Sequence, residues 1–143
     1  RPATPQGSDA AIRSWLDARG ISIPELELEN GSGLSRREKI SAGSLGRLLQ
    51  AAWKSSVMPE LMSSLPVAAI DGTMRKRLKK NGIAGQAHIK TGSLEGVRSI
   101  AGYVLDTTGR RWIVVFFINH ANAGNAQAAQ DALLDWVYEQ GAK

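Results

Sequence analysis

Apolar residues recur three and four positions apart in the first part of the chain, and this spacing predicts amphipathic helices. The first helix is expected to begin at Ser8 or Asp9, whose side chains suit a helix N-cap, and to end at Gly20. Further helices are predicted over residues 41–55 and 59–64. The residues expected to face inward are Ala11, Ile12, Trp15 and Leu16 in the first helix, and Leu45, Leu48, Leu49 and Ala52 in the second.

Alternating or continuous apolar runs predict strands elsewhere in the chain. Residues 26–29 alternate and indicate a short strand with one buried face. Three longer strands are predicted over residues 86–92, 99–106 and 111–119, and their short connections favour antiparallel pairing. A long amphipathic helix is expected over residues 122–140, and its packed face should hold Ala129, Leu133, Trp136 and Val137. The predicted fold class is therefore α+β, a three-stranded antiparallel meander with packed helices that include a long C-terminal helix.

The length of 143 residues and a hydrophobic content of 43% suit one domain or part of a larger one. The longest apolar run, Trp112–Ile118, has seven residues and is too short to span a bilayer. The chain starts without Met and without a signal-peptide pattern, so we expect a processed or truncated piece. Four tryptophans fall at positions that favour packing in a core, namely Trp15, Trp53, Trp112 and Trp136.

The chain contains no cysteine and only two histidines, His88 and His120. Disulfides, cysteine-ligated zinc, iron–sulfur clusters and thiol catalysis are therefore excluded. A Ser-His-Asp triad or a histidine metal site would have to use one of the two histidines. His88 lies two residues before Lys90 in a predicted strand, and we expect it to be partly solvated. We predict neither a cofactor nor a metal.

The net charge is +5, and five of the positive residues lie within residues 75–80, in a predicted helical turn that opens at Asp71 and closes at Asn81–Gly82. Such a cluster is more typical of a solvated helix face than of an anion-binding surface. An aromatic content of 6% offers little surface for stacking bases, so no nucleic acid partner is expected. A non-catalytic basic module that binds peptidoglycan or nucleic acid stays open as the alternative function.

Residues 90–93 read Lys-Thr-Gly-Ser and are expected to end the first of the three long strands. The lysine can attract a carboxylate, the hydroxyl of Thr91 can bind the same group, and Gly92 lets a peptide backbone lie against the strand. The backbone N–H of Ser93 can face a developing oxyanion. The same residues also fit an edge strand with a protective lysine and a glycine turn.

A glycine-rich loop covers residues 30–36 and reads Asn-Gly-Ser-Gly-Leu-Ser-Arg. It lacks the Gly-x-Ser-x-Gly pattern of a nucleophile elbow. Its Asn-Gly and Ser-Gly pairs suit tight turns, and Ser35 suits the cap of a following helix. Arg36 could pair with a substrate or sheet carboxylate, or lie at the surface.

Three segments resemble one protein family. Residues 90–104, Lys-Thr-Gly-Ser-Leu-Glu-Gly-Val-Arg-Ser-Ile-Ala-Gly-Tyr-Val, resemble the third motif region of penicillin-interacting serine D,D-peptidases. Residues 29–36 are similar to the Asp-Gly-Ser-Gly-Leu-Ser-Arg segment of the class C low-molecular-mass penicillin-binding proteins, with Asn30 where Asp is usual. Residues 71–75 resemble a Gly-Thr-(Leu/Met)-Arg stretch of that branch. These proteins are D-alanyl-D-alanine carboxypeptidases with endopeptidase activity, in the serine β-lactamase/DD-peptidase superfamily.

The resemblance implies a mechanism and a set of site residues. In the family, the serine of a Ser-x-x-Lys motif attacks the penultimate D-Ala carbonyl, an acyl-enzyme forms, and water releases the shortened stem peptide; β-lactams trap the acyl stage. Lys90 and Ser93 are the expected catalytic residues, Lys90 beside the substrate carboxylate and the Ser93 N–H in the oxyanion hole. The expected substrate-binding residues are Thr91, Gly92, Ser32 and Ser35.

Two motifs of that family are absent from the sequence, because no serine has lysine three residues later and none has asparagine two residues later. The resemblance implies that residues 1–143 are the C-terminal part of a penicillin-binding (transpeptidase-like) domain, without the nucleophile and inactive alone. In the family, the three strands belong to a five-stranded sheet whose other strands come from the N-terminal part. The expected setting is the periplasm, and the expected partners are peptidoglycan stem peptides, β-lactams and the missing N-terminal part. Alone, the chain is expected to be marginally stable, to self-associate through the unpaired strand edge, or to stay bound to the missing part.

Overall fold

A computed structural model describes residues 4–79 and 82–142 and folds them into four α-helices and one three-stranded sheet. The helices are α1 (Pro5–Asp17), α2 (Ala42–Trp53), α3 (Met58–Ser64) and α4 (Gln127–Tyr138). The strands β1 (Ala87–Leu94), β2 (Val97–Leu105) and β3 (Arg111–Asn119) pair antiparallel in the order β1-β2-β3. Short 3-10 turns are η1 (Gly72–Met74), η2 (Ala123–Asn125) and η3 (Glu139–Ala142). The predicted α+β meander is confirmed.

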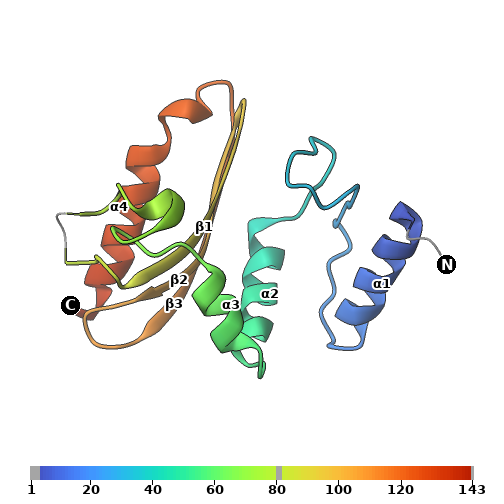
Figure 1. Ribbon diagram of the computed structural model, residues 1–143, viewed down its shortest axis with the longest axis horizontal. Coiled ribbons are helices and arrows are strands. Elements are labelled where there is room, and N and C mark those ends of the chain that lie inside the picture. Colours follow the sequence, from blue (N-terminus) through green and yellow to red (C-terminus); the bar gives the residue numbers. More distant parts are fainter. Residues whose placement is uncertain (1–3, 80–81, 143) are drawn as a thin grey trace.

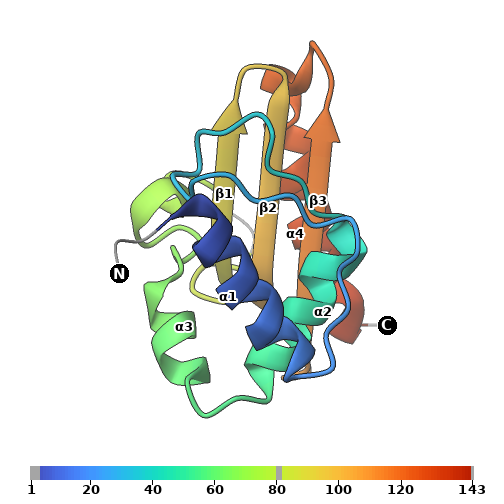
Figure 2. The same ribbon diagram turned by 90° about the vertical axis from the view of Figure 1, so that its right-hand side faces the viewer.

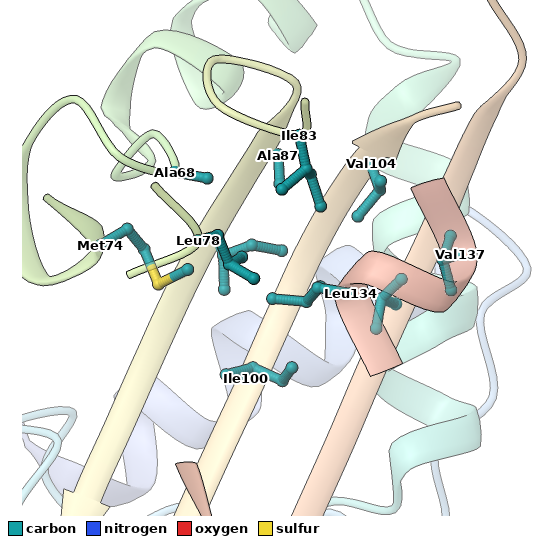
Figure 3. Packing of buried hydrophobic residues seen from close by; sticks show 11 residues of the cluster. Ala68, Met74, Leu78, Ile83, Ala87, Ile100, Val104, Leu134 and Val137 are labelled. Atoms are coloured by element: carbon teal, nitrogen blue, oxygen red, sulfur yellow. The ribbon is translucent and has the colours of Figure 1, made fainter. Parts of the chain in front are cut away.

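The sheet has helices on both faces (Figure 1). Helix α4 covers one face, α2 and α3 lie on the other, and α1 lies beyond α2, farther from the sheet (Figures 1 and 2). None of the described helices combines the length and the apolar character that crossing a membrane requires. The main core lies between the sheet, α4 and the segment before β1 (Figure 3); it contains Ala68, Met74, Leu78, Ile83, Ala87, Ile89, Ile100, Val104, Val114, Leu134 and Val137.

Helix α1 packs through a second, smaller cluster, and its start differs from the prediction. It begins at Pro5 because the hydroxyl of Thr4, rather than Ser8 or Asp9, caps it by accepting a hydrogen bond from the Gly7 N–H at 3.1 Å. Of its predicted buried face only Leu16 is buried. The cluster consists of Leu16, Ile21, Ile23 and Leu26, with Ile40, Leu48 and Ala51 packed against it.

The predicted strand over residues 26–29 is reduced to one bridge, in which Glu27 and Lys39 exchange two backbone hydrogen bonds of 3.0 Å. Pro24 lies just before this segment and the glycine-rich loop begins directly after it, so no longer ladder forms.

The predicted basic helical turn is also wrong, because it contains only the 3-10 turn η1. Leu78 has a φ of +59°, a left-handed conformation that interrupts a helix. Arg77 is buried rather than solvated, and its guanidinium contacts the carboxylate of Asp131 in α4 at 2.6 Å. Lys80 and Asn81, which were expected near the end of this turn, lie outside the described residues.

The buried face of α4 is rotated in part from the predicted one, because Val137 is buried and Leu133 packs against the core as predicted but the other two predicted residues do not. Its buried residues are Gln130, Leu134 and Val137, whereas Ala129 and Trp136 are exposed. Arg77 contributes to this rotation because it also donates a hydrogen bond of 3.4 Å to the Gln130 side chain. Two polar residues of α4, Gln130 and Asp131, thus face Arg77 where the sequence pattern predicted apolar contacts.

The expectation that the four tryptophans pack in the core is wrong. Their exposed fractions run from 38% for Trp112 to 55% for Trp136. Three rings lie beside an arginine, an attraction that does not require burial. The guanidinium carbon lies 3.9 Å from the ring centroid for Arg19 over Trp15, 5.3 Å for Arg111 over Trp53 and 5.5 Å for Arg110 over Trp112.

Strand β3 leaves one edge unpaired among the described residues, since its only neighbour is β2. The strand is nine residues long, contains no proline or glycine, and is apolar from Trp112 to Ile118. An exposed edge of this kind is a template for pairing with another strand.

We therefore expect the isolated chain to self-associate through β3. Sedimentation velocity should show an average mass that rises with protein concentration. A monomer at every concentration that also unfolds in one cooperative transition would contradict this expectation.

Candidate functional site

The Lys-Thr-Gly-Ser segment lies inside β1 rather than at its end, because the strand continues to Leu94. On the outer edge of β1, Val67 forms a bridge with His88, and the Ile89 N–H donates to the Pro66 carbonyl at 2.8 Å. Alternate residues of a strand turn their backbone groups to the same edge. Thr91 and Ser93 therefore present N–H and C=O groups there, where no described segment pairs with β1 beyond Ile89. The Ser93 N–H therefore lies at this open edge, and its role as an oxyanion donor stays a prediction.

Lys90 and Thr91 point to opposite faces of β1. The exposed Lys90 side chain curls back, and its Nζ donates to the Thr91 carbonyl oxygen at 2.7 Å. On the other face, the Thr91 hydroxyl donates to the Thr73 hydroxyl in η1 at 2.8 Å. Three polar groups from Lys90, Thr91 and Thr73 therefore gather beside the free edge.

Gly92 lies directly opposite Ser99 of β2. A Cβ added at Gly92 would come within 2.2 Å of the Ser99 Oγ. Lys90, Gly92 and Ser99 share one face of the sheet, so the missing side chain of Gly92 makes room for the Ser99 hydroxyl. This packing requirement is one the sequence pattern does not reveal.

The loop serines organise the loop itself. The Ser35 hydroxyl donates to the Glu29 carboxylate and accepts from the Arg37 N–H at 3.0 Å. The Ser32 hydroxyl accepts from the Leu34 N–H at 3.2 Å. Among the described residues, neither hydroxyl hydrogen-bonds to residues 90–93, so a substrate contact of Ser32 or Ser35 stays a prediction.

Arg36 connects this loop to the end of β1. Its Nη1 donates to the Glu95 carbonyl oxygen at 3.1 Å, and its Nη2 lies 3.9 Å from the Glu95 carboxylate. With the Thr73–Thr91 contact, this bond brings the three segments of the sequence resemblance to one place. Sequence reasoning assigned no role to Thr73 or Glu95. The position of Thr73 within the Gly-Thr-Met-Arg stretch was the available signal.

Two carboxylates stabilise the loop and the segment that joins it to α2 by accepting hydrogen bonds. Glu25 accepts hydrogen bonds from the Ser41 hydroxyl at 2.5 Å and from the Ser44 hydroxyl at the start of α2, and these lower the pKa of Glu25 from 4.5 to about 2. Glu38 accepts from the Gly31 N–H at 2.9 Å and the Asn30 N–H at 3.2 Å, which also lowers its pKa.

Neither histidine ring forms a hydrogen bond with Lys90, Thr91 or Thr73; each contacts a backbone group instead. His88 is half-buried and its Nδ1 lies 3.3 Å from the Met62 carbonyl oxygen. His120 follows β3 and its Nδ1 accepts from the Asn122 N–H at 3.0 Å. Within the described ranges no three His, Asp or Glu side chains cluster closely enough to hold a metal ion.

Residues 1–140 match the family described as D-Ala-D-Ala carboxypeptidase 3 (S13). The chain belongs to this family. It is 34% identical over 135 residues to the D-alanyl-D-alanine carboxypeptidase DacB of Haemophilus influenzae, which covers 90% of this chain and 27% of that protein. It is 32% identical over 139 residues to carboxypeptidase Rv3627c of Mycobacterium tuberculosis, covering 93% and 30%.

Solved structures share the fold of this chain. The crystal structure of penicillin-binding protein 4 (dacB) from Haemophilus influenzae matches with a TM-score of 0.81 and 30% identity over 96% of this chain and 33% of that one. An endopeptidase of Bdellovibrio bacteriovorus, 18% identical, matches in fold with a TM-score of 0.68. The chain thus spans about a third or less of the length of the family members it matches.

The support from Glu25 predicts how stability changes with pH. Because the folded-state pKa lies below the ordinary value of 4.5, ionised Glu25 stabilises the fold above that pH, and this contribution is lost as the pH falls toward about 2. Glu25→Gln should be less stable at neutral pH and should lose less stability on acidification. Chemical denaturation at several pH values measures this, with Glu27→Gln as the control that removes only an exposed ion pair. Equal acid sensitivity in wild type and Glu25→Gln would argue against it.

The contact between Gly92 and Ser99 predicts a rescue. Gly92→Ala should destabilise the chain by about 1–3 kcal/mol through overpacking. Adding Ser99→Ala should restore stability, because the Ser99 Cβ lies 3.6 Å from the added methyl.

Gly102→Ala is the matched control for this rescue. Its Cβ would come within 2.0 Å of the His88 carbonyl oxygen, a backbone atom that Ser99→Ala cannot relieve. Equilibrium unfolding of Gly92→Ala and of Gly102→Ala, each with and without Ser99→Ala, measures this rescue. A Gly92→Ala/Ser99→Ala variant no more stable than Gly92→Ala would refute the packing role.

Proposed function

We propose that this chain supplies the Lys-Thr-Gly wall of the acyl-transfer site in a serine-type D-Ala-D-Ala carboxypeptidase that acts on peptidoglycan stem peptides. The observation that carries the proposal is the free edge of β1, where Lys90, the Thr91 hydroxyl and the Ser93 N–H gather. Membership of the S13 family supports it. In this proposal residues 1–143 are the C-terminal part of a penicillin-binding domain that works in the periplasm.

The chemistry divides between this chain and the remainder of the domain. A serine oxygen supplied by that remainder attacks the penultimate D-Ala carbonyl carbon, and negative charge moves to the carbonyl oxygen. The Ser93 N–H stabilises this oxyanion. The C–N bond to the terminal D-Ala then breaks, the amine leaves with a proton, and water hydrolyses the ester in a second step.

The substrate enters as an added strand. An extended peptide can pair with the Thr91 and Ser93 backbone groups at the open edge of β1. Its terminal carboxylate is attracted by the Lys90 ammonium and accepts a hydrogen bond from the Thr91 hydroxyl. A β-lactam carries the same pair of groups, a carboxylate and a reactive carbonyl, and is attacked in the same position.

Intact-mass measurement after incubation with penicillin tests the proposal. The chain alone should gain no adduct, since it contains no Ser-x-x-Lys motif. The longer protein that includes the sequence upstream of Arg1 should gain the mass of one penicillin. Lys90→Ala in that protein should slow acylation about 100-fold.

Each of the other outcomes contradicts a stated part of the proposal. An adduct on the chain alone would place the nucleophile among its own serines. No adduct on either protein would refute the enzyme function. In that case binding to nucleic acid that weakens steeply with salt would favour the basic-module alternative.

A further inference from the structure

Thr73 and Thr91 meet although 18 residues separate them. Thr73 belongs to η1 and Thr91 to β1, and their hydroxyl oxygens are 2.8 Å apart. A hydroxyl has one proton to donate and two lone pairs that accept, and it rotates to suit its partners. The pair is therefore a unit in which the orientation of one hydroxyl depends on the other.

The turn that carries Thr73 is held in place by its neighbours. Met74 is fully buried in the core, and its carbonyl oxygen accepts from the Ala69 N–H at 3.1 Å. The Asp71 carboxylate accepts from the Val67 N–H at 2.6 Å. Gly72 has a φ of +49°, and a Cβ there would approach the Pro66 Cβ to 3.0 Å. Conformation and close packing therefore both require glycine just before Thr73.

The same segment is tied directly to β1. The Pro66 carbonyl accepts from the Ile89 N–H at 2.8 Å, and the Ala68 N–H donates to the Ala87 carbonyl at 2.9 Å. These bonds set the position of η1 relative to the strand independently of the Thr73–Thr91 contact. Thr73 thus meets Thr91 as a fixed group of the scaffold.

We propose that Thr73 is a positioning residue that orients the Thr91 hydroxyl as a donor to the carboxylate of the substrate. The inference rests on the proposed function and adds a residue to it. In the free chain Thr91 donates to Thr73. When a carboxylate binds, Thr91 turns its proton to the anion and Thr73 donates to the Thr91 oxygen instead. No covalent bond breaks, and both hydroxyls keep their protons.

The reversed pair binds an anion better than a lone threonine does. A hydroxyl that accepts a hydrogen bond becomes a stronger donor, because the two bonds polarise one another. The donor to a carboxylate also makes a charge-assisted bond, which is stronger than one to a neutral group. The contribution of Thr73 should therefore be larger for a substrate that ends in a carboxylate than for one that ends in an amide.

The test uses the longer protein that carries this chain with its upstream sequence. Thr73→Val removes the hydroxyl and keeps the shape, whereas Thr73→Ser keeps the hydroxyl. The substrates are a D-Ala-D-Ala peptide and its C-terminal amide. We expect Thr73→Val to lower kcat/KM for the acid about five- to tenfold, to change it little for the amide, and so to reduce the acid-to-amide preference. Thr73→Ser should restore that preference.

A background without the Thr91 hydroxyl completes the design. In Thr91→Val, adding Thr73→Val should have no further effect on the acid substrate, because Thr73 acts through Thr91. Equal losses for acid and amide, or additive effects of the two valines, would overturn the inference. Should Thr73→Val fail to fold, Thr73→Ala provides the same comparison.

Penicillin acylation of the wild-type protein separates the two proposals. A wild type that is acylated and prefers the acid, beside a Thr73→Val variant with an unchanged preference, overturns the role of Thr73 alone. A wild type that is never acylated overturns the proposed function as well.

Discussion

Strand β1 is paired along its whole length with β2, while its other edge is hydrogen-bonded only as far as Ile89. Backbone polar groups must find a partner or water, so the open part of that edge is where an extended peptide can add. The Lys-Thr-Gly-Ser residues coincide with this open part. The segment around Pro66 hydrogen-bonds to the first residues of β1 and continues into η1, which places Thr73 beside Thr91.

The loop before α2 contacts the chain just after the end of β1, at Glu95. Arg36 holds it to Glu95, and the carboxylates of Glu25 and Glu38 hold its base through hydroxyl and backbone donors. The wall of the proposed site is therefore assembled from three segments that are distant in sequence. Glycine at position 92 belongs to the same assembly, because Ser99 occupies the space on that face.

In the described part of the chain, the edge of β3 is open to a further strand. An open groove of about 330 Å³ lies beside α1, and Ile12, Trp15 and Leu28 contribute apolar surface to it. Exposed apolar surface of this kind is characteristic of interfaces. This distribution supports the proposal that the chain packs against further parts of a penicillin-binding domain. Family members about three times its length agree with that proposal.

Residue order alone predicted the three long strands and α3 to within about two residues at each end, whereas the start of α1 and the strand over residues 26–29 were predicted wrongly. The bounds of β3 agree at both ends, and α3 differs from its prediction by one residue. Local patterns suffice there, because continuous β-branched and aromatic runs between turn residues have few alternatives. The Lys-Thr-Gly motif and the family were also readable from residue order alone.

Tertiary structure decided which faces are buried and which groups meet. Arg77 and Asp131 are 54 residues apart, and their contact turns a polar side of α4 inward. The tryptophans stay half-exposed, and arginines lie against three of them; of these arginines only Arg111, over Trp53, comes from a distant part of the sequence. The partner of Thr91 and the need for glycine at position 92 depend on segments that only folding brings together. The periodicity of a sequence depends only on the hydrophobicity of its residues, whereas burial and hydrogen bonding also depend on which distant residues pack against them in the folded chain.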